Sequence, residues 1–171
     1  QLMTTALRSF LRFAQYRGDL KSNLASCVPS VASWSLSSVP KSLPRLHVKQ
    51  LLAGCNRTTA AGRRDYAMLL LLARLGLRGG EVANLTLDDI DWEGGSITVC
   101  GKTGRVDQLP LPSDVWMAIA AYLKAGRPPS SDSRRLFLRL KAPLTGFKDQ
   151  RAVGSLVRNA LAKAGINWPR K

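Results

Sequence analysis

Histidine and cysteine are scarce in this chain. Its 171 residues contain one histidine, His47, and three cysteines, Cys27, Cys55 and Cys100, at wide spacings. Because there is neither a Cys-x-x-Cys pair nor a histidine cluster, a Cys/His zinc module is excluded, and an odd cysteine count does not favour a disulfide framework. We therefore expect no metal and no cofactor, and interpret the three cysteines as small buried apolar residues.

A long apolar run is also missing. The longest, AMLLLLA at residues 67–73, is far shorter than the roughly 18 consecutive apolar residues of a membrane-spanning helix. The early stretch LRSFLRFAQYRGDLK spreads its charges along a helix, so it does not resemble a secretion signal. We therefore expect a cytoplasmic protein with no membrane partner.

Acidic residues are too few to balance the basic ones. Lys and Arg number 26 against 11 Asp and Glu, which gives a formal net charge of +15. Such a positive field favours polyanions as partners. Since 45% of the residues are hydrophobic, the chain can bury a core, and its length suggests one domain with part of a second.

Hydrophobic periodicity predicts helices in the first half of the chain. Apolar positions at helical spacing indicate an amphipathic helix at residues 4–17. Serines and prolines at 33–46 indicate a linker. We expect a short helix from His47 to Gly54 and a long one that stops at Gly76, followed by a short helix that begins near Gly79.

The second half predicts a β-hairpin between helices. SITVCGKTGRVDQLPL alternates apolar and polar residues around a glycine-bearing turn, which indicates two antiparallel strands. Ser113 and Asp114 are capping candidates for a helix that stops at Gly126. LFLRL, at 136–140, reads as a short strand, and a last helix is expected at 148–164. The predicted class is α+β, mainly α-helical.

Two segments carry a family resemblance. LGLRGGEVANLTLDDIDW, followed by GKTGRVDQLPLP, resembles the first conserved box and the β-hairpin of the tyrosine recombinases, also called phage integrases. The similarity covers about residues 47–168. It implies an integrase-type catalytic domain with a small antiparallel hairpin or sheet, incomplete at 47–171, after a linker at 33–46 and a remnant of a helical, SAM-like core-binding domain at 1–32.

The resemblance also implies roles for three residues. Arg78 matches one of two arginines that clamp the scissile phosphate, Lys102 matches the general acid, and Glu81 matches an acidic residue that braces the arginine. Physically, a phosphodiester under attack needs fixed positive charge at its nonbridging oxygens, and a guanidinium can donate two parallel hydrogen bonds there. An ammonium on a hairpin can protonate the departing oxygen.

Other basic residues are expected to contact the DNA backbone. These candidates are Arg105, Arg74, Lys41 and Arg45. By resemblance, the partner is double-stranded DNA, which the parent protein breaks and rejoins through a 3′-phosphotyrosyl intermediate. The parent protein would work as a recombinase homo-oligomer, a tetramer on DNA.

Parts of the family's active site have no match in this chain. The family uses a His-x-x-Arg box and a later tyrosine nucleophile, but no histidine follows His47, and Tyr16, Tyr66 and Tyr122 are better explained by helix packing. We therefore expect a fragment that binds DNA without cleaving it. Without its missing helices, apolar surface near Leu156, Val157 and Leu161 is expected either to be exposed or to pair with another copy.

Simpler interpretations remain for the same residues. Arg78 with Glu81 could be an ordinary helical ion pair, Lys102 a solvated turn residue, and Asp88, Asp89 and Asp91 helix-end and turn residues. One alternative is a noncatalytic, helix-turn-helix-like DNA-binding protein. Another is a recombinase paralogue that is naturally truncated.

Overall fold

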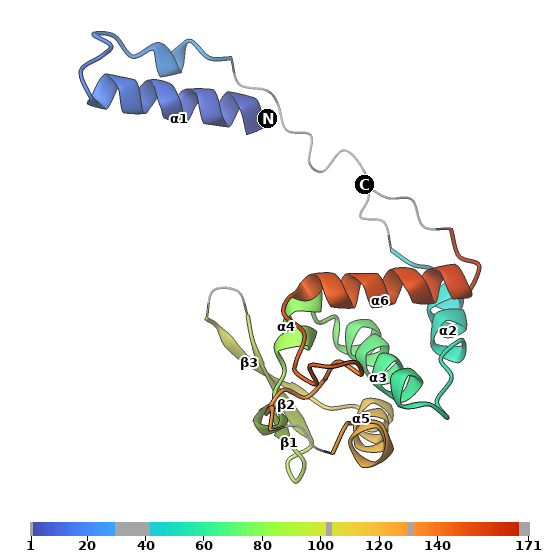
Figure 1. Ribbon diagram of the computed structural model, residues 1–171. Helices are drawn as coiled ribbons and strands as arrows, with labels where there is room; N and C mark the ends of the chain where they lie inside the picture. Colours follow the sequence, from blue (N-terminus) through green and yellow to red (C-terminus); the bar gives the residue numbers. More distant parts are fainter. Residues whose placement is uncertain (1, 30–41, 102–103, 130–131, 168–171) are drawn as a thin grey trace. The chain divides into compact units, whose positions relative to one another are not determined.

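The computed structural model describes residues 2–29, 42–101, 104–129 and 132–167. The chain divides into two compact units, Gln1–Ser42 and Leu43–Lys171. Helices dominate, and the described residues include a three-stranded antiparallel sheet in the order β1-β2-β3 (Figure 1). The predicted α+β, mainly helical class is confirmed. None of the helices in the described ranges combines the length and the apolar character that a membrane crossing needs.

The first unit contains α1 (Leu2–Tyr16), which confirms the helix predicted at residues 4–17. A short 3-10 helix, η1 (Leu24–Ser26), follows it. The Arg8 guanidinium donates a hydrogen bond of 2.7 Å to the Val28 carbonyl, which ties the end of this unit back to α1. Most large apolar side chains of α1 are exposed: Leu2, Met3, Leu7, Phe10, Phe13 and Tyr16.

The second unit begins with two helices, α2 (Arg45–Ala53) and α3 (Ala60–Leu75). The Thr59 hydroxyl caps α3 by accepting a hydrogen bond of 3.0 Å from the Gly62 N–H. α3 ends at Gly76, whose φ of 64° is left-handed, as its sequence predicted. Glycine is favoured here because a side chain would be strained in that conformation.

The sheet consists of β1 (Ile90–Asp91), β2 (Ser96–Cys100) and β3 (Val106–Pro110). β2 pairs antiparallel with both neighbours, and its register with β3 runs from Ser96–Pro110 to Cys100–Val106. The predicted hairpin is confirmed. β1 was not predicted, because two residues are too short to show an alternating pattern.

Three further α-helices complete the second unit, together with a short 3-10 helix, η2 (Leu87–Asp89). They are α4 (Gly79–Asn84), α5 (Ser113–Ala125) and α6 (Gln150–Lys163). The predicted capping of α5 by its first residues is wrong. Pro112 holds the N-cap position, so the helix starts one residue earlier, although the Asp114 carboxylate accepts a hydrogen bond of 3.0 Å from the Val115 N–H in the first turn.

The strand predicted at 136–140 is also wrong. The backbone N–H of Leu138 donates to the Tyr122 hydroxyl at 3.1 Å, and not to a neighbouring strand. Its neighbours bond to several different elements, so no continuous ladder forms. Two isolated bridges take its place, Thr86–Arg135 and Leu138–Gly146.

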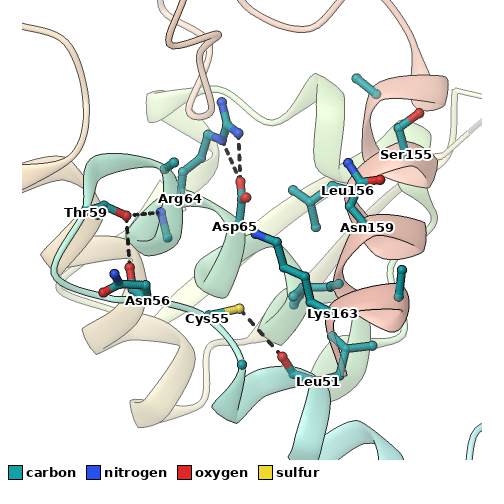
Figure 2. Close-up of a pocket in the computed structure, with 17 residues that line it drawn as sticks. Leu51, Cys55, Asn56, Thr59, Arg64, Asp65, Ser155, Leu156, Asn159 and Lys163 are labelled. Atoms are coloured by element: carbon teal, nitrogen blue, oxygen red, sulfur yellow. Dashed lines mark hydrogen bonds and ion pairs between the residues drawn. The ribbon is translucent and has the colours of Figure 1, made fainter. Parts of the chain in front are cut away.

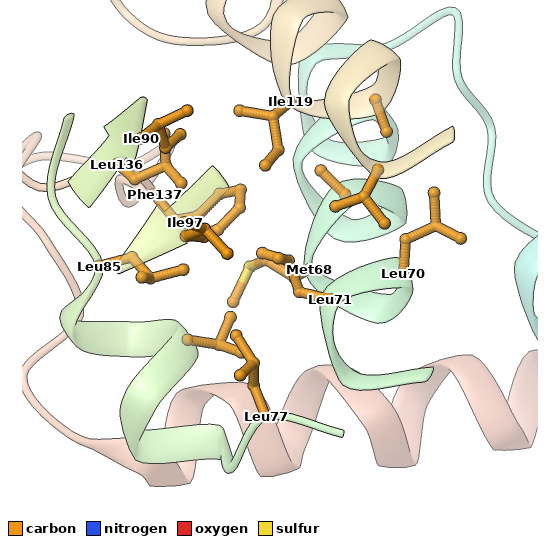
Figure 3. Close-up of a cluster of buried hydrophobic side chains, with 14 of the residues drawn as sticks. Met68, Leu70, Leu71, Leu77, Leu85, Ile90, Ile97, Ile119, Leu136 and Phe137 are labelled. Atoms are coloured by element: carbon orange, nitrogen blue, oxygen red, sulfur yellow. The ribbon is translucent and has the colours of Figure 1, made fainter. Parts of the chain in front are cut away.

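The core of the second unit is built around α3, whose Ala67–Leu71 run is buried (Figure 3). Side chains from β2 and α5 pack against it, and Trp92, in the turn after β1, packs edge-to-face on Trp116 of α5 with ring centroids 5.5 Å apart. α6 covers another side. The expected exposure near the end of α6 is wrong, because Leu161 is buried and Leu156 and Val157 are partly buried against α2 and α3.

Cysteine and tyrosine positions need further corrections. Cys27 and Cys100 are exposed and Cys55 is only half-buried, so the expected burial of all three is wrong. Tyr122 is buried, which confirms packing, whereas Tyr16 is exposed at the last residue of α1. The remaining tyrosine, Tyr66, is partly buried against the core.

Candidate phosphate-binding site

Arg78 sits at the junction between α3 and α4. Leu77 is buried, and Arg78 follows as the N-cap residue of α4 with extended backbone. This arrangement anchors the main chain on both sides of the arginine. Its side chain nevertheless remains 80% exposed, so the guanidinium faces solvent from a fixed base.

Glu81 holds Arg78 by two hydrogen bonds. One carboxylate oxygen accepts from the Arg78 backbone N–H at 2.7 Å, and the other accepts from Nη1 at 2.8 Å. Arginine has no acceptor, so only the glutamate half of a capping box exists. Because Glu81 bonds Nη1 alone, the opposite edge of the guanidinium has no partner among the described residues and can donate to a further ligand.

The pKa of Glu81 is lowered from its ordinary value, first by the backbone N–H of Arg78 and then by its guanidinium. Burial and the charge of Asp107 act in the opposite direction. The carboxylate therefore stays ionised near neutral pH and keeps Arg78 in place.

α6 packs against the start of α4. A Cβ at Gly79 would lie 3.5 Å from Val153 Cβ, and one at Gly80 would lie 3.6 Å from the Gln150 amide oxygen. Both are ordinary contacts, and neither glycine has a positive φ. Neither packing nor backbone strain within the described residues therefore requires these glycines, which leave the first turn of α4 without side-chain cover.

The hairpin between β2 and β3 turns tightly. Gly101 N–H donates to the Arg105 carbonyl at 2.7 Å, and Gly104 N–H donates back to the Gly101 carbonyl at 3.0 Å. Gly104 has a φ of 78°, a conformation that favours glycine. Lys102 belongs to this turn but lies outside the described residues, so its predicted role stays a prediction.

Asp107, for which the sequence predicted no role, influences the Arg78–Glu81 pair electrostatically. Asp107 on β3 accepts a hydrogen bond of 2.8 Å from Arg105 Nε, and its charge acts on the Glu81 carboxyl. Asp107 therefore acts electrostatically on Glu81 as well as pairing with Arg105. The sequence gives little signal for this, because Asp107 and Glu81 lie on different elements far apart along the chain.

The other predicted DNA contacts have different surroundings. Arg74, near the end of α3, pairs with Asp114 of α5 at 2.6 Å. Arg45 begins α2 and lines the same cleft as Arg74. Lys41 lies outside the described residues.

A separate cavity of about 600 Å³ lies between α2, α3 and α6 (Figure 2). It contains the Arg64–Asp65 ion pair and the Cys55 thiol, but none of the predicted site residues lines it. Burial raises the pKa of Cys55, so its reactive thiolate form is disfavoured. The cavity shows no chemistry connected with Arg78.

The aspartates after α4 serve the local structure. Asp88 pairs with Arg134, Asp89 accepts hydrogen bonds from the backbone and hydroxyl of Thr86, and Asp91 accepts from Gly94 N–H. Their interpretation as helix-end and turn residues is confirmed. No group of three His, Cys, Asp or Glu side chains suited to a metal ion occurs among the described residues.

Arg78 thus has the geometry of an oxyanion contact. An anchored guanidinium with one free edge can donate two hydrogen bonds to a phosphate without reorganising.

Comparison with known proteins identifies a family for this chain. Residues 41–170 match the model of the phage integrase family. The chain is 56% identical to the putative integrase/recombinase y4rA of Sinorhizobium fredii over 171 residues, which are 100% of this chain and 41% of that protein.

Solved structures give a similar result. The XerA recombinase structure has a TM-score of 0.66 and 25% identity, covering 90% of this chain and 51% of that one. A lambda integrase tetramer bound to a Holliday junction has a TM-score of 0.69 at 16% identity, covering 99% of this chain and 48% of that one, and shows likeness of fold alone. The chain spans about half or less of the length of these proteins. The family match covers most of the residues, and the chain belongs to the phage integrase family of tyrosine recombinases.

Proposed function

We propose that this chain forms part of a site-specific DNA recombinase that breaks and rejoins DNA through a 3′-phosphotyrosyl intermediate. In this proposal Arg78 clamps the scissile phosphate, Glu81 holds the arginine, and Lys102 protonates the departing oxygen. The observation that carries it is the exposed guanidinium of Arg78, fixed at its base by two bonds from Glu81.

DNA binding is the second part of the proposal. The net charge of +15 favours a polyanion, and Arg105, Arg74, Arg45 and Lys41 are proposed to contact the backbone. Structures of similar fold include a lambda integrase dimer bound to a core site and a lambda integrase tetramer bound to a Holliday junction, which supports a tetramer on DNA for the whole protein. Residues 1–32 are proposed to belong to a core-binding domain and 47–171 to the catalytic domain.

We propose further that the chain by itself binds DNA without cutting it. Tyr122 is buried and Tyr66 is partly buried in the core. Neither of these two therefore offers a free phenol beside Arg78. A noncatalytic helix-turn-helix protein is less well supported. Its recognition helix would be α4, which has only six residues and whose Glu81 side chain bonds Arg78.

The test compares wild type, Arg78→Ala and Lys124→Ala on a duplex oligonucleotide. We expect none of the three to nick the duplex. The slope of log affinity against log salt should be shallower by about 0.9 for Arg78→Ala, but not for Lys124→Ala. In a longer protein that contains these residues, Arg78→Ala should slow cleavage by at least about 10²- to 10³-fold while most binding remains. Loss of binding with cleavage unchanged would show that the clamp assignment is wrong.

A further inference from the structure

A small basic cleft opens between α2 and the last turn of α3. Its volume is about 290 Å³. It is lined by Arg45, Val48, Lys49, Leu52, Ala73 and Arg74. Three cationic side chains from two helices therefore surround one opening, and the rest of its lining is apolar.

Two of these cations have no acidic partner in the part of the chain that the structure describes. Arg45 and Lys49 are exposed and lie four residues apart, on the same face of α2. Like charges at this spacing repel each other. An anion placed between them would remove that repulsion.

The third cation, Arg74, is paired within the protein. Its Nε and Nη2 both contact one oxygen of Asp114, at 2.7 and 2.6 Å. The guanidinium is more than half exposed, and an exposed ion pair contributes little stability. A stronger anion can therefore compete with Asp114 for Arg74.

We propose that this α2–α3 cleft is a second phosphate site, which holds one backbone phosphate of a DNA duplex beside the phosphate at Arg78. Asp114 is an internal counterion that weakens the contribution of Arg74 until DNA displaces it. The apolar lining suits the deoxyribose next to the phosphate. Arg74, in the last turn of α3, precedes Arg78 by four residues across the Gly76 bend, so the two cations lie on either side of one connection. The inference rests on the proposed DNA binding.

The test measures the affinity of the 171-residue chain for a mixed-sequence duplex between about 50 and 200 mM salt. The double variant Arg45→Gln/Lys49→Gln should lower the salt slope by about 0.9, so that its affinity falls three- to fourfold less across this range. Its matched control is Lys124→Gln/Arg158→Gln, which removes the same charges from α5 and α6. The control should change the slope much less.

A second variant should act in the opposite direction. Asp114→Asn releases Arg74, so we expect tighter binding and a steeper salt slope. Glu93→Gln removes an exposed acid from the turn before β2 and should have a clearly smaller effect. A purely structural role for Asp114 would not produce a gain in binding.

The outcomes separate the two proposals. If the wild-type chain does not bind the duplex, both DNA binding and the cleft are wrong. If wild type binds and Arg78→Ala lowers the slope, but the double variant matches its control, only the cleft is wrong. An Asp114→Asn chain that binds no better than Glu93→Gln also contradicts the cleft.

Discussion

Arg78 shows how a single side chain can be both fixed and available. Its backbone N–H and one guanidinium nitrogen are held by Glu81, while most of its surface faces solvent. Fixing the base of a long side chain reduces the entropy lost when its free end binds a ligand. The contact with Glu81 is therefore part of the site and also part of the fold.

The stability of this contact should depend on pH. The folded pKa of Glu81 lies below its ordinary value of 4.5, so its contribution is present above that value and is lost as the pH falls through the folded pKa. Glu81→Gln should lower Tm by about 2–4 °C at pH 7, from the loss of roughly 1 kcal/mol. The difference from wild type should shrink in acid.

Thermal unfolding followed by circular dichroism at several pH values would check this prediction. Glu93→Gln is the control, because that side chain is exposed and forms no ion pair within the described residues. A Glu81→Gln deficit that is constant down to low pH would contradict the assigned role of the carboxylate.

At the residue scale, Arg78 and Glu81 could be identified as a pair from the sequence because they lie three positions apart in one motif. The sequence could not identify the Arg74–Asp114 pair, whose members are separated by 40 positions and meet only because α3 packs on α5. The influence of Asp107 on Glu81 was missed for the same reason.

Among the elements, the α3–α4 connection depends on one glycine. Gly76 has a φ of 64°, which a side chain would strain, although nothing lies within 4 Å of its Cβ position. Gly76→Ala should therefore lower the free energy of unfolding by about 1–2 kcal/mol. Gly154 in the middle of α6 has equally open surroundings and no positive φ, so Gly154→Ala should raise it by about 0.5–1 kcal/mol.

Urea unfolding of the two variants would test this pair. Equal effects of both substitutions would mean that backbone conformation does not explain the glycine at the end of α3. Destabilisation by Gly154→Ala would instead point to a contact on α6 that the structure does not show.

Element prediction succeeded where periodicity was long and failed where it was short. α3 and α6 span several turns, and their apolar spacing located them closely. The LFLRL segment is too brief to show which neighbours it will meet, and its backbone bonds to several separate elements. α5 begins one residue earlier than predicted because Pro112 takes the N-cap position. Residue preferences for capping do not include the backbone conformation of the preceding residue.

For the whole molecule, the stability of the second unit should depend mainly on the hydrophobic core around α3. Leu71 is 0% exposed at the centre of that core, whereas Leu46 on α2 is 64% exposed. Leu71→Ala should lower the free energy of unfolding by about 2–5 kcal/mol, and Leu46→Ala should change it by less than about 0.5 kcal/mol.

Urea titration followed by far-UV circular dichroism would compare the two leucine variants. A large loss for Leu46→Ala would mean that α2 meets a surface beyond those described. A small loss for Leu71→Ala would contradict the central position of α3.

The contact between Trp92 and Trp116 joins the sheet to α5. Two indole rings 5.5 Å apart and inclined at 79° form a coupled pair of chromophores. The exciton-coupled part of their circular dichroism depends on mutual orientation, so that part disappears when the turn after β1 leaves the helix, even if both keep their backbone structure. The protein therefore has a built-in spectroscopic marker of tertiary packing, located on elements that are distinct from the helices that carry the proposed phosphate contacts.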